Sequence, residues 1–183
     1  LTTTQMKSKV SVTDNGSMAY FVATDSYIKS LNPNTANPVI NQISLSDDWD
    51  NVAVSKDGNR IAAISSYIDT AIYVFDLTTG DGRRFHLYNP TTSHTNTDAG
   101  GVLYADAIEF DNTGENLIYD AYNVLNSNTS EDISYWDIGF INVWDNNLTD
   151  FGSGEISKLY GSLPENVSIG NPVFSKNSPY IIA

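Results

Sequence analysis

Apolar segments alternate with short polar turns along this chain, and one version of this pattern occurs four times. Each copy consists of an apolar segment, a polar turn centred on Gly (Ser in the last copy) and a second apolar segment. Two apolar runs joined by such a turn predict a β-hairpin, and a unit repeated along a chain predicts a solenoid or a propeller. The four copies are Val12–Phe21, Val54–Ala63, Phe110–Tyr119 and Phe174–Ala183.

A second pair of strands follows each of the first three copies. The third strand of each unit ends on an apolar residue followed by Asp or Asn, whose short side chain can hydrogen-bond the turn backbone. β-branched and aromatic residues dominate these runs. The predicted fold is therefore all-β, a β-propeller of four-stranded antiparallel blades. The third and fourth strands are expected within 27–40, 71–87 and 140–160, with Trp144 ending the third strand of the last of these.

The repeats divide the chain into about three blades and the first strands of a fourth. Three blades and a part cannot close a ring, and an open edge is an aggregation hazard. Since residue 1 is Leu rather than Met, we expect residues 1–183 to be a single propeller-type domain or a fragment. The remaining blades would come from the rest of a longer chain, or alternatively from a partner. The predicted blades span about 8–43, 50–88 and 104–160, and the fourth begins at about 171–183.

Three longer connections are predicted, at 88–103, 123–135 and 161–170. In an up-and-down blade all three emerge on the face opposite the tight Gly turns. Binding residues tend to lie on long loops over a rigid scaffold, so the long-loop face is the expected ligand-binding face.

Charge and composition limit the classes of molecule that the chain is expected to bind. The 183 residues include 22 acidic and 9 basic side chains, a net charge of −13. This field repels a nucleic-acid backbone and favours cationic ligands or basic protein surfaces, although solubility alone also explains it. Cys is absent, which excludes disulfides and thiolate metal sites. No apolar run reaches the ~18 residues of a membrane span.

No catalytic constellation is recognisable. A Gly-x-Ser-x-Gly nucleophile elbow is absent, and so are His-Glu-x-x-His and EF-hand spacings. The only histidines are His86, in an outer strand, and His94, in a polar loop. No catalytic residue is therefore predicted, and whether the whole protein is an enzyme stays open.

Two carboxylates stand at equivalent positions of the repeat. Asp50 and Asp106 both lie eight residues before the turn Gly, next to the strand that would line the channel. They could form an acidic rim suited to a basic side chain or to a hard cation such as calcium. The alternative is that each carboxylate caps its own loop. Asp47, Asp48 and Asp98 are nearby in sequence, whereas Ser8 and Gly170 occupy the equivalent position in the first and fourth units.

Aromatic residues border the same face. Rings of this kind hold sugars and peptides because their faces are apolar and their edges polar, although they can equally well cover the ends of the sheets. Tyr135 also borders this face. Together with the carboxylates, the predicted ligand-binding residues are Asp50, Asp106, Asp98, Trp49, Tyr104 and Trp136.

Two segments carry a resemblance to a known repeat. Val54–Ile61 reads Val-Ser-Lys-Asp-Gly-Asn-Arg-Ile, and Phe75–Gly80 reads Phe-Asp-Leu-Thr-Thr-Gly. These segments resemble the TolB-like propeller repeat, a relative of the WD repeat with apolar-Ser-Pro-Asp-Gly and apolar-Asp-Leu-x-Thr-Gly turns. Lys56 stands where the family usually has Pro.

The resemblance implies a bacterial propeller of the periplasm or the extracellular space. We interpret the chain as a non-catalytic binding or protein-interaction module. The long loops and the acidic charge favour a protein or a small polar or cationic ligand on the long-loop face. No cofactor is predicted, although a divalent cation such as calcium would suit the acidic rim. The repeats also resemble the propellers of prolyl-oligopeptidase-type serine peptidases and of some pectate-degrading lyases. The alternative is therefore the propeller portion of a larger peptidase or polysaccharide lyase.

Overall fold

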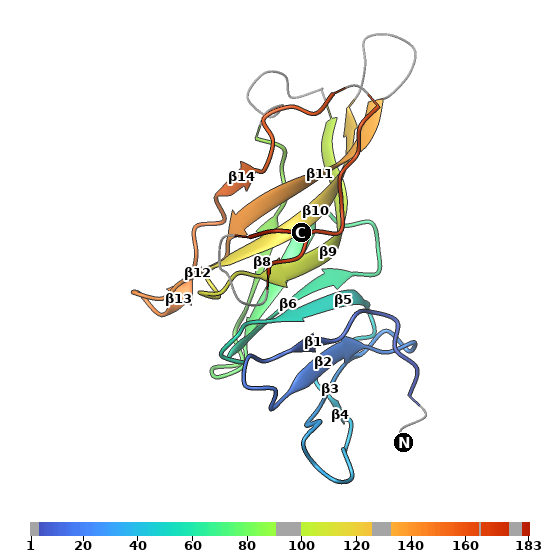
Figure 1. Cartoon of the computed structure of the whole chain (residues 1–183), viewed down its shortest axis with the longest axis vertical. Coiled ribbons are helices and arrows are strands. Elements are labelled where there is room, and N and C mark those ends of the chain that lie inside the picture. The colour runs from blue at the N-terminus through green and yellow to red at the C-terminus, as the bar shows by residue number, and fades with distance from the viewer. Residues whose placement is uncertain (1–3, 91–99, 126–132, 165, 176–180) are drawn as a thin grey trace.

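The strands of the chain form three four-stranded antiparallel sheets (Figure 1). The computed structural model describes residues 4–90, 100–125, 133–164, 166–175 and 181–183, and these contain strands and no helix. It follows that the described residues include no helix long and apolar enough to cross a membrane.

The first two sheets follow the repeat closely, and in each the strand order in space is the order in sequence. The second sheet is the more regular, because its strands are five or six residues long. The first sheet consists of β1 (Ser11–Val12), β2 (Ala19–Val22), β3 (Ile28–Leu31) and β4 (Asn41–Gln42); the second consists of β5 (Trp49–Val54), β6 (Arg60–Ser65), β7 (Ala71–Asp76) and β8 (Gly82–His86).

The third sheet has longer strands and an insertion. Its order is β9 (Gly100–Phe110), β10 (Asn116–Leu125), β11 (Ile133–Asn142) and β14 (Ile156–Lys158). Between β11 and β14 a separate hairpin pairs β12 (Trp144–Asp145) with β13 (Asp150–Phe151). The prediction that Trp144 ends the third strand is therefore wrong, because the sheet strand stops at Asn142 and Trp144 begins the inserted hairpin.

The end of the chain begins a fourth unit. Phe174 and Ile182 form an antiparallel bridge, and the Ser175 amide donates to the Ile181 carbonyl at 2.7 Å. The first pairing of a blade thus follows three complete four-stranded sheets. This is the architecture of an incomplete β-propeller, and the predicted fold class is confirmed.

The turn glycines explain why the repeat is readable in sequence. Gly16, Gly58 and Gly114 have φ values of +67°, +80° and +71°, a region that residues with a Cβ rarely adopt. The Gly58 amide donates to the Ser55 carbonyl at 2.9 Å and closes the turn. The expectation of a positive φ at Gly58 is confirmed.

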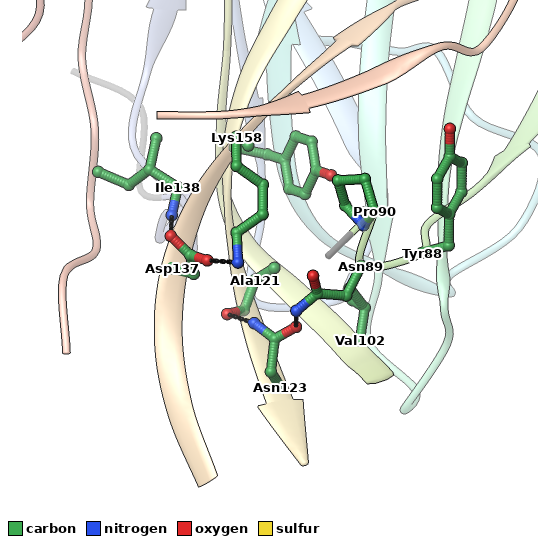
Figure 2. Close-up of a pocket in the computed structure, with 11 residues that line it drawn as sticks. Tyr88, Asn89, Pro90, Val102, Ala121, Asn123, Asp137, Ile138 and Lys158 are labelled. Carbon is green, nitrogen blue, oxygen red and sulfur yellow. Dashed lines mark hydrogen bonds and ion pairs between the residues drawn. The ribbon is translucent and has the colours of Figure 1, made fainter. Parts of the chain in front are cut away.

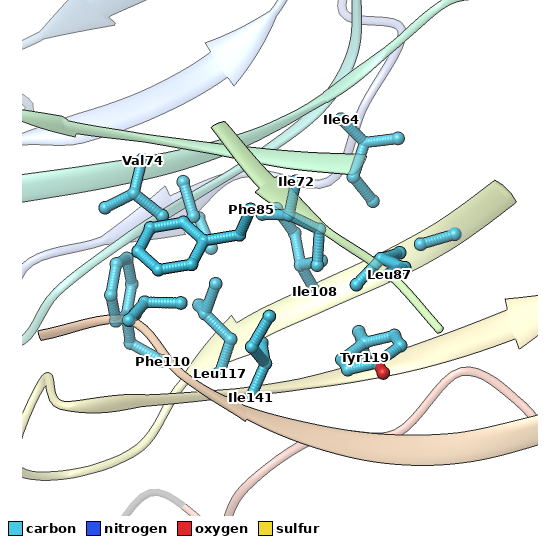
Figure 3. Close-up of a cluster of buried hydrophobic side chains, with 14 of the residues drawn as sticks. Ile64, Ile72, Val74, Phe85, Leu87, Ile108, Phe110, Leu117, Tyr119 and Ile141 are labelled. Carbon is cyan, nitrogen blue, oxygen red and sulfur yellow. The ribbon is translucent and has the colours of Figure 1, made fainter. Parts of the chain in front are cut away.

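Apolar side chains fill the spaces between successive sheets. Sheets two and three share one buried cluster, which Figure 3 shows, and a second cluster joins sheets one and two. Each sheet therefore buries its faces against its neighbours, as sheets that pack face to face do. The first cluster includes Ile72, Val74, Phe85 and Leu87 from sheet two and Ile108, Phe110, Leu117, Tyr119 and Ile141 from sheet three.

The third sheet extends beyond the other two. β10 pairs with β11 up to Leu125 and Ile133, so both ends of the predicted 123–135 connection are strand, and β9 already begins at Gly100. The strand pairing continues through these residues, and the pattern alone predicted a loop because the segments beyond them are rich in Ser, Thr, Asn and Asp. The extension rises at the top of Figure 1; residues 91–99 and 126–132 lie outside the described part.

Candidate functional site

The innermost strands of the blades share an irregularity at one position. In sheet two the register shifts between Trp49 and Asn51, which leaves Asp50 as the extra residue. In sheet three, Asp106 and Ala107 together face the single residue Asp120. Such β-bulges re-aim side chains and are frequent beside binding sites. The two carboxylates that the sequence aligned thus occupy equivalent bulges.

The first blade carries a related feature. The amides of Lys7 and Ser8 both donate to the Val22 carbonyl, at 2.8 and 3.2 Å. Here the hydroxyl of Ser8 accepts the Val22 amide at 2.8 Å. At this position of the repeat, blade one has a hydroxyl that hydrogen-bonds the backbone, whereas blades two and three have carboxylates.

The two bulges are neighbours in space. The side-chain amide of Asn51 donates to the backbone carbonyl of Asp106 at 2.8 Å, which joins β5 to β9. The Asp50 carboxylate is close enough to act electrostatically on Asp106. The fold therefore places near each other two acidic side chains that are 56 residues apart in sequence and that occupy the same position of the repeat.

The two carboxylates differ in their partners. Asp50 Oδ1 pairs with Lys7 Nζ at 2.7 Å. Within the described part of the chain, no hydrogen bond or ion pair reaches the carboxylate of Asp106. Burial raises the pKa of Asp106, and the negative charges of Asp120 and Asp50 raise it further, whereas Lys9 opposes them. An unpaired acid with a raised pKa is a functional-site candidate.

A buried carboxylate fixes the Asp106 bulge. Asp120 Oδ1 accepts the amides of Asp106 and Ala107 at 3.0 and 2.7 Å, and Oδ2 accepts the amide of Asn171 at 2.8 Å. Asp120 is buried, so these amides depend on it. Sequence reasoning missed this residue, and the available signal was a lone Asp between apolar residues within a predicted strand.

A central cavity of about 410 Å³ opens next to the bulges. Asn51 and Ala107, which line it, directly follow Asp50 and Asp106 in sequence. Inner-strand residues of the three sheets and 172–174 of the fourth unit contribute the remaining walls. The cavity is the channel that the propeller prediction places along the innermost strands.

Three aromatic rings form a cluster on the extended part of the third sheet. Tyr122 lies opposite both Tyr104 and Trp136 in the ladder, and the ring centres are 5.2–5.6 Å apart. All three side chains are partly exposed. Two of them were predicted ligand-binding residues; Tyr122 was missed, because it has a role only once the cross-strand register is known.

One of the rings is close to Asp106 in sequence. Tyr104 and Asp106 both belong to β9 and are two residues apart. Ala105, between them, is buried in the cluster between sheets two and three, so Tyr104 points away from that cluster. The bulge at Asp106 and Ala107 interrupts the alternation of side chains at this point. The unpaired carboxylate thus lies two residues along β9 from the aromatic cluster.

The other predicted site residues lie elsewhere. Trp49 packs edge-on against Tyr73 and Phe75, with ring centres 5.4 and 5.8 Å apart, so it belongs to the space between sheets one and two. Asp98 lies outside the described residues, as does His94. No group of three or more His, Cys, Asp or Glu side chains gathers as a metal site would require in the part of the chain described.

A buried polar cluster lies on the face of the third sheet opposite the rings, because Asn123 and Asp137 directly follow Tyr122 and Trp136 along their strands. Figure 2 shows this cluster. Asp137 forms an ion pair with Lys158, and Asn89 donates to the side-chain oxygen of Asn123 at 2.9 Å. The space between these residues is about 10 Å³, room for about one water molecule. Burial raises the pKa of the nearby Tyr119, which stays protonated. The cluster is an internal polar contact between blades rather than a ligand site.

Comparisons with known proteins found similarity to solved structures but to no protein family. No family model matches the chain, and no curated protein matches it. Among solved structures, the tricorn protease is 15% identical over 90% of this chain with a TM-score of 0.48. The nidogen/laminin complex is 16% identical over 75% with a TM-score of 0.45. The acylaminoacyl peptidase of Pyrococcus horikoshii is 13% identical over 85% with a TM-score of 0.47.

The chain spans 17%, 44% and 25% of those three chains, respectively. The similarities are low in both identity and TM-score. The assignment of the fold therefore rests on the three sheets and the fourth-blade bridge of this chain itself.

Proposed function

We propose that this chain is a non-catalytic binding module that captures a cationic group of a protein or small-molecule ligand at Asp106, next to the channel. The observation that carries the proposal is the Asp106 carboxylate, which repels Asp50 and Asp120 and has no ion-pair partner among the described residues. A cation placed there would relieve this repulsion. Asp50 is already paired with Lys7, so Asp106 is the open acceptor.

The cluster of Tyr104, Tyr122 and Trp136 indicates which kind of cation the proposed site prefers. Ring faces attract ammonium and guanidinium groups when these lie within about 6 Å of the ring centre. A Lys or Arg side chain could thus pair with Asp106 and cover one of the rings at the same time. Calcium, the other cation suggested by the acidic rim, would gain nothing from the rings, and we rank it second.

The wider biological setting is proposed from the repeats. The turns at Val54–Ile61 and Phe75–Gly80 support a TolB-like propeller of a bacterial envelope or secreted protein, acting in the periplasm or outside the cell. Further blades in a longer chain would complete the ring. The strong negative charge of −13 suits a basic partner surface and disfavours nucleic acid.

The second candidate is the propeller portion of a peptidase or polysaccharide lyase. The resemblance of the repeats to propellers of those enzymes favours it. His86, the only histidine within the described residues, is exposed and contacts Thr70, so catalytic groups would have to come from another part of the protein. The sequence of the full-length gene separates the two candidates: a nucleophile elbow followed by Asp and His favours the enzyme.

Binding of simple cations tests the proposal. We would titrate the chain with Nα-acetyl-arginine amide, Nα-acetyl-lysine amide, calcium chloride and the neutral Nα-acetyl-glutamine amide, using calorimetry and NMR. We expect the two cationic amides to bind and Asp106→Asn to weaken them about tenfold. Trp136→Leu should weaken them about threefold through loss of the ring.

Asp150→Asn is the matched control, because Asp150 is an exposed carboxylate on β13, away from the channel. It removes the same charge and should leave both affinities unchanged. Equal weakening by Asp150→Asn and Asp106→Asn would mean that only the net charge matters, and the proposed site would be wrong. Tighter binding of calcium than of the amides would contradict the preferred ligand.

A further inference from the structure

A second candidate site lies in the crevice between sheets one and two, away from the channel. Two hollows of about 540 and 400 Å³ open there, and both are lined by Ser46, Trp49 and Phe75. One extends to Tyr67 and Ile68, in the connection after β6, and the other to Leu77, in the turn after β7. They meet at Trp49, so together they form one groove that runs along β7.

The lengths of the strands explain the groove. The two outer strands of sheet one, β3 and β4, have four and two residues, whereas β7 and β8 of sheet two have six and five. The shorter sheet cannot cover the whole of the longer one. The rings of Tyr73 and Phe75 consequently remain only partly buried against the cluster between the sheets.

The rim of the groove is apolar and exposed. Leu45 is 100% exposed, Ile68 73% and Tyr67 68%, and all three line the hollows. Single exposed apolar side chains are ordinary, but several around one hollow indicate a surface that binds a partner. Burying them in a complex would gain free energy in proportion to the apolar area covered.

A polar group in the groove lacks a partner. Trp49 is only 8% exposed, and its indole Nε1–H makes no hydrogen bond with any described residue. A buried donor without an acceptor costs stability, and tryptophans in cores ordinarily find one. The nitrogen is itself shielded from solvent, so the exposed rim rather than this N–H is the surface that a ligand can contact.

The charges of the groove are acidic. Its described lining includes Asp48, Asp69 and Asp76 and no Lys or Arg. Asp69 pairs with Arg84 at 2.7 Å, and Asp76 accepts the hydroxyls of the turn after β7. Asp48 has no such partner within the described part of the chain, so one carboxylate stays available to a basic side chain of a ligand.

We propose that this groove binds an extended peptide segment of a partner protein, with two apolar side chains and a neighbouring Lys or Arg. The apolar side chains would cover Leu45 and Ile68, and the basic side chain would pair with Asp48. The six residues of β7 span roughly 17–20 Å, which matches five or six extended peptide residues. This site is independent of Asp106.

Short labelled peptides test the groove. The probes are fluorescein-labelled five-residue peptides with Leu at two alternate positions, Ser between them, and Lys, Glu or Ser at either end. Fluorescence anisotropy with the 183-residue chain should show saturable binding that is tightest for a Lys peptide. Leu45→Ser and Ile68→Ser should each weaken it about tenfold, and Asp48→Asn should abolish the preference for Lys over Glu.

Matched controls separate this site from others. Leu148→Ser removes a similarly exposed Leu (75% exposed) from the turn between β12 and β13, and should change nothing. Asp106→Asn should also leave the peptide affinity unchanged, so failure here and failure at the channel are distinguishable.

Three results would overturn the proposal. The first is the absence of saturable binding by every Lys peptide. The second is equal weakening by Leu45→Ser and Leu148→Ser, which would indicate non-specific adsorption. The third is a dimer in sedimentation experiments that Leu45→Ser converts to monomer, because a second copy of the chain would then be the occupant of the groove.

Discussion

The guanidinium carbon of Arg60, on β6, lies 4.7 Å from the centre of the Trp144 ring, on β12. The same guanidinium pairs with Asp57 at 2.9 Å, and both Arg60 and Trp144 are buried. Trp144 in turn packs edge-on against Phe151 of β13. The inserted hairpin of blade three thus covers a cation that belongs to blade two, and it joins the two blades at the short-turn end.

A double-mutant cycle measures this contact. Arg60→Gln should lower the free energy of unfolding by about 1–3 kcal/mol, because it removes the ring contact and leaves Asp57 without its cation. Combined with Trp144→Leu, the loss should be smaller than the sum of the single losses by about 0.5–2 kcal/mol. Urea unfolding gives the four values. Losses that add within about 0.3 kcal/mol would mean that the two side chains do not interact.

Two turn glycines with similar backbones should respond differently to the same change. Gly114→Ala would place a Cβ 2.8 Å from the Arg60 Nη2 atom, whereas nothing lies within 4 Å of a Cβ at Gly16. Both φ values are positive, so each Ala costs about 1–2 kcal/mol of backbone strain. Gly114→Ala should lose about 1 kcal/mol more, because Arg60 must move off Trp144. Thermal or urea unfolding of the two variants checks this, and equal losses would contradict it.

The blades were predictable because their turns require particular residues. Gly58 and Gly114 adopt conformations that exclude most other residues, and each lies between two apolar strands. The β12–β13 hairpin was not predictable, since Trp144 continues the apolar alternation after Asn142 and nothing local shows that the chain leaves the sheet there. In the folded chain the hairpin contacts Arg60, which lies 84 residues before Trp144 in sequence.

The site was only partly predictable for the same reason. Asp50 and Asp106 are the same number of residues before their turn glycines, so alignment of the repeats was enough to identify them as equivalent. Asp120 and Tyr122 belong to the neighbouring strand, and their roles follow from the bulge and the cross-strand pairing. From the sequence, Trp49 was interpreted as an aromatic residue at the long-loop face. In the structure it lies at the base of the groove, because the short strand β4 does not cover it.

The buried Asp120 should be essential to the geometry of the bulge. Asp120→Ala leaves the amides of Asp106, Ala107 and Asn171 without their acceptor, and we expect a loss of about 2–4 kcal/mol in the free energy of unfolding. Asp150→Ala, which removes an acceptor for the amide of Phe151 alone at an exposed turn, should cost less than about 0.5 kcal/mol. Chemical denaturation compares the two; a similar loss in both would show that the bulge does not depend on Asp120.

Asp76 should stabilise the fold only while it is charged. Burial alone would raise the pKa of Asp76, but hydrogen bonds from Thr78 and Thr79 outweigh burial and lower it below its usual value. A lowered pKa gives stability that is present above about pH 4 and is lost as the pH falls through the folded-state value. Asp76→Ala should therefore cost about 1–3 kcal/mol at pH 7 and less at pH 2 than at pH 7. Urea unfolding at both pH values tests this, and a pH-independent cost would contradict it.

The charge of Asp106 should have the opposite effect and lower the free energy of unfolding. Burial and the charges of Asp120 and Asp50 raise the pKa of Asp106, so its ionisation destabilises the fold as the pH rises through about 4 and above. Asp106→Asn should raise the free energy of unfolding at pH 7, by less than about 1 kcal/mol because the side chain is exposed, and leave it unchanged at pH 3. A cationic ligand that pairs with Asp106 should remove the destabilisation in the wild type alone. If Asp106→Asn lowers stability at pH 7 in urea unfolding, the carboxylate is a structural cap and not an open acceptor.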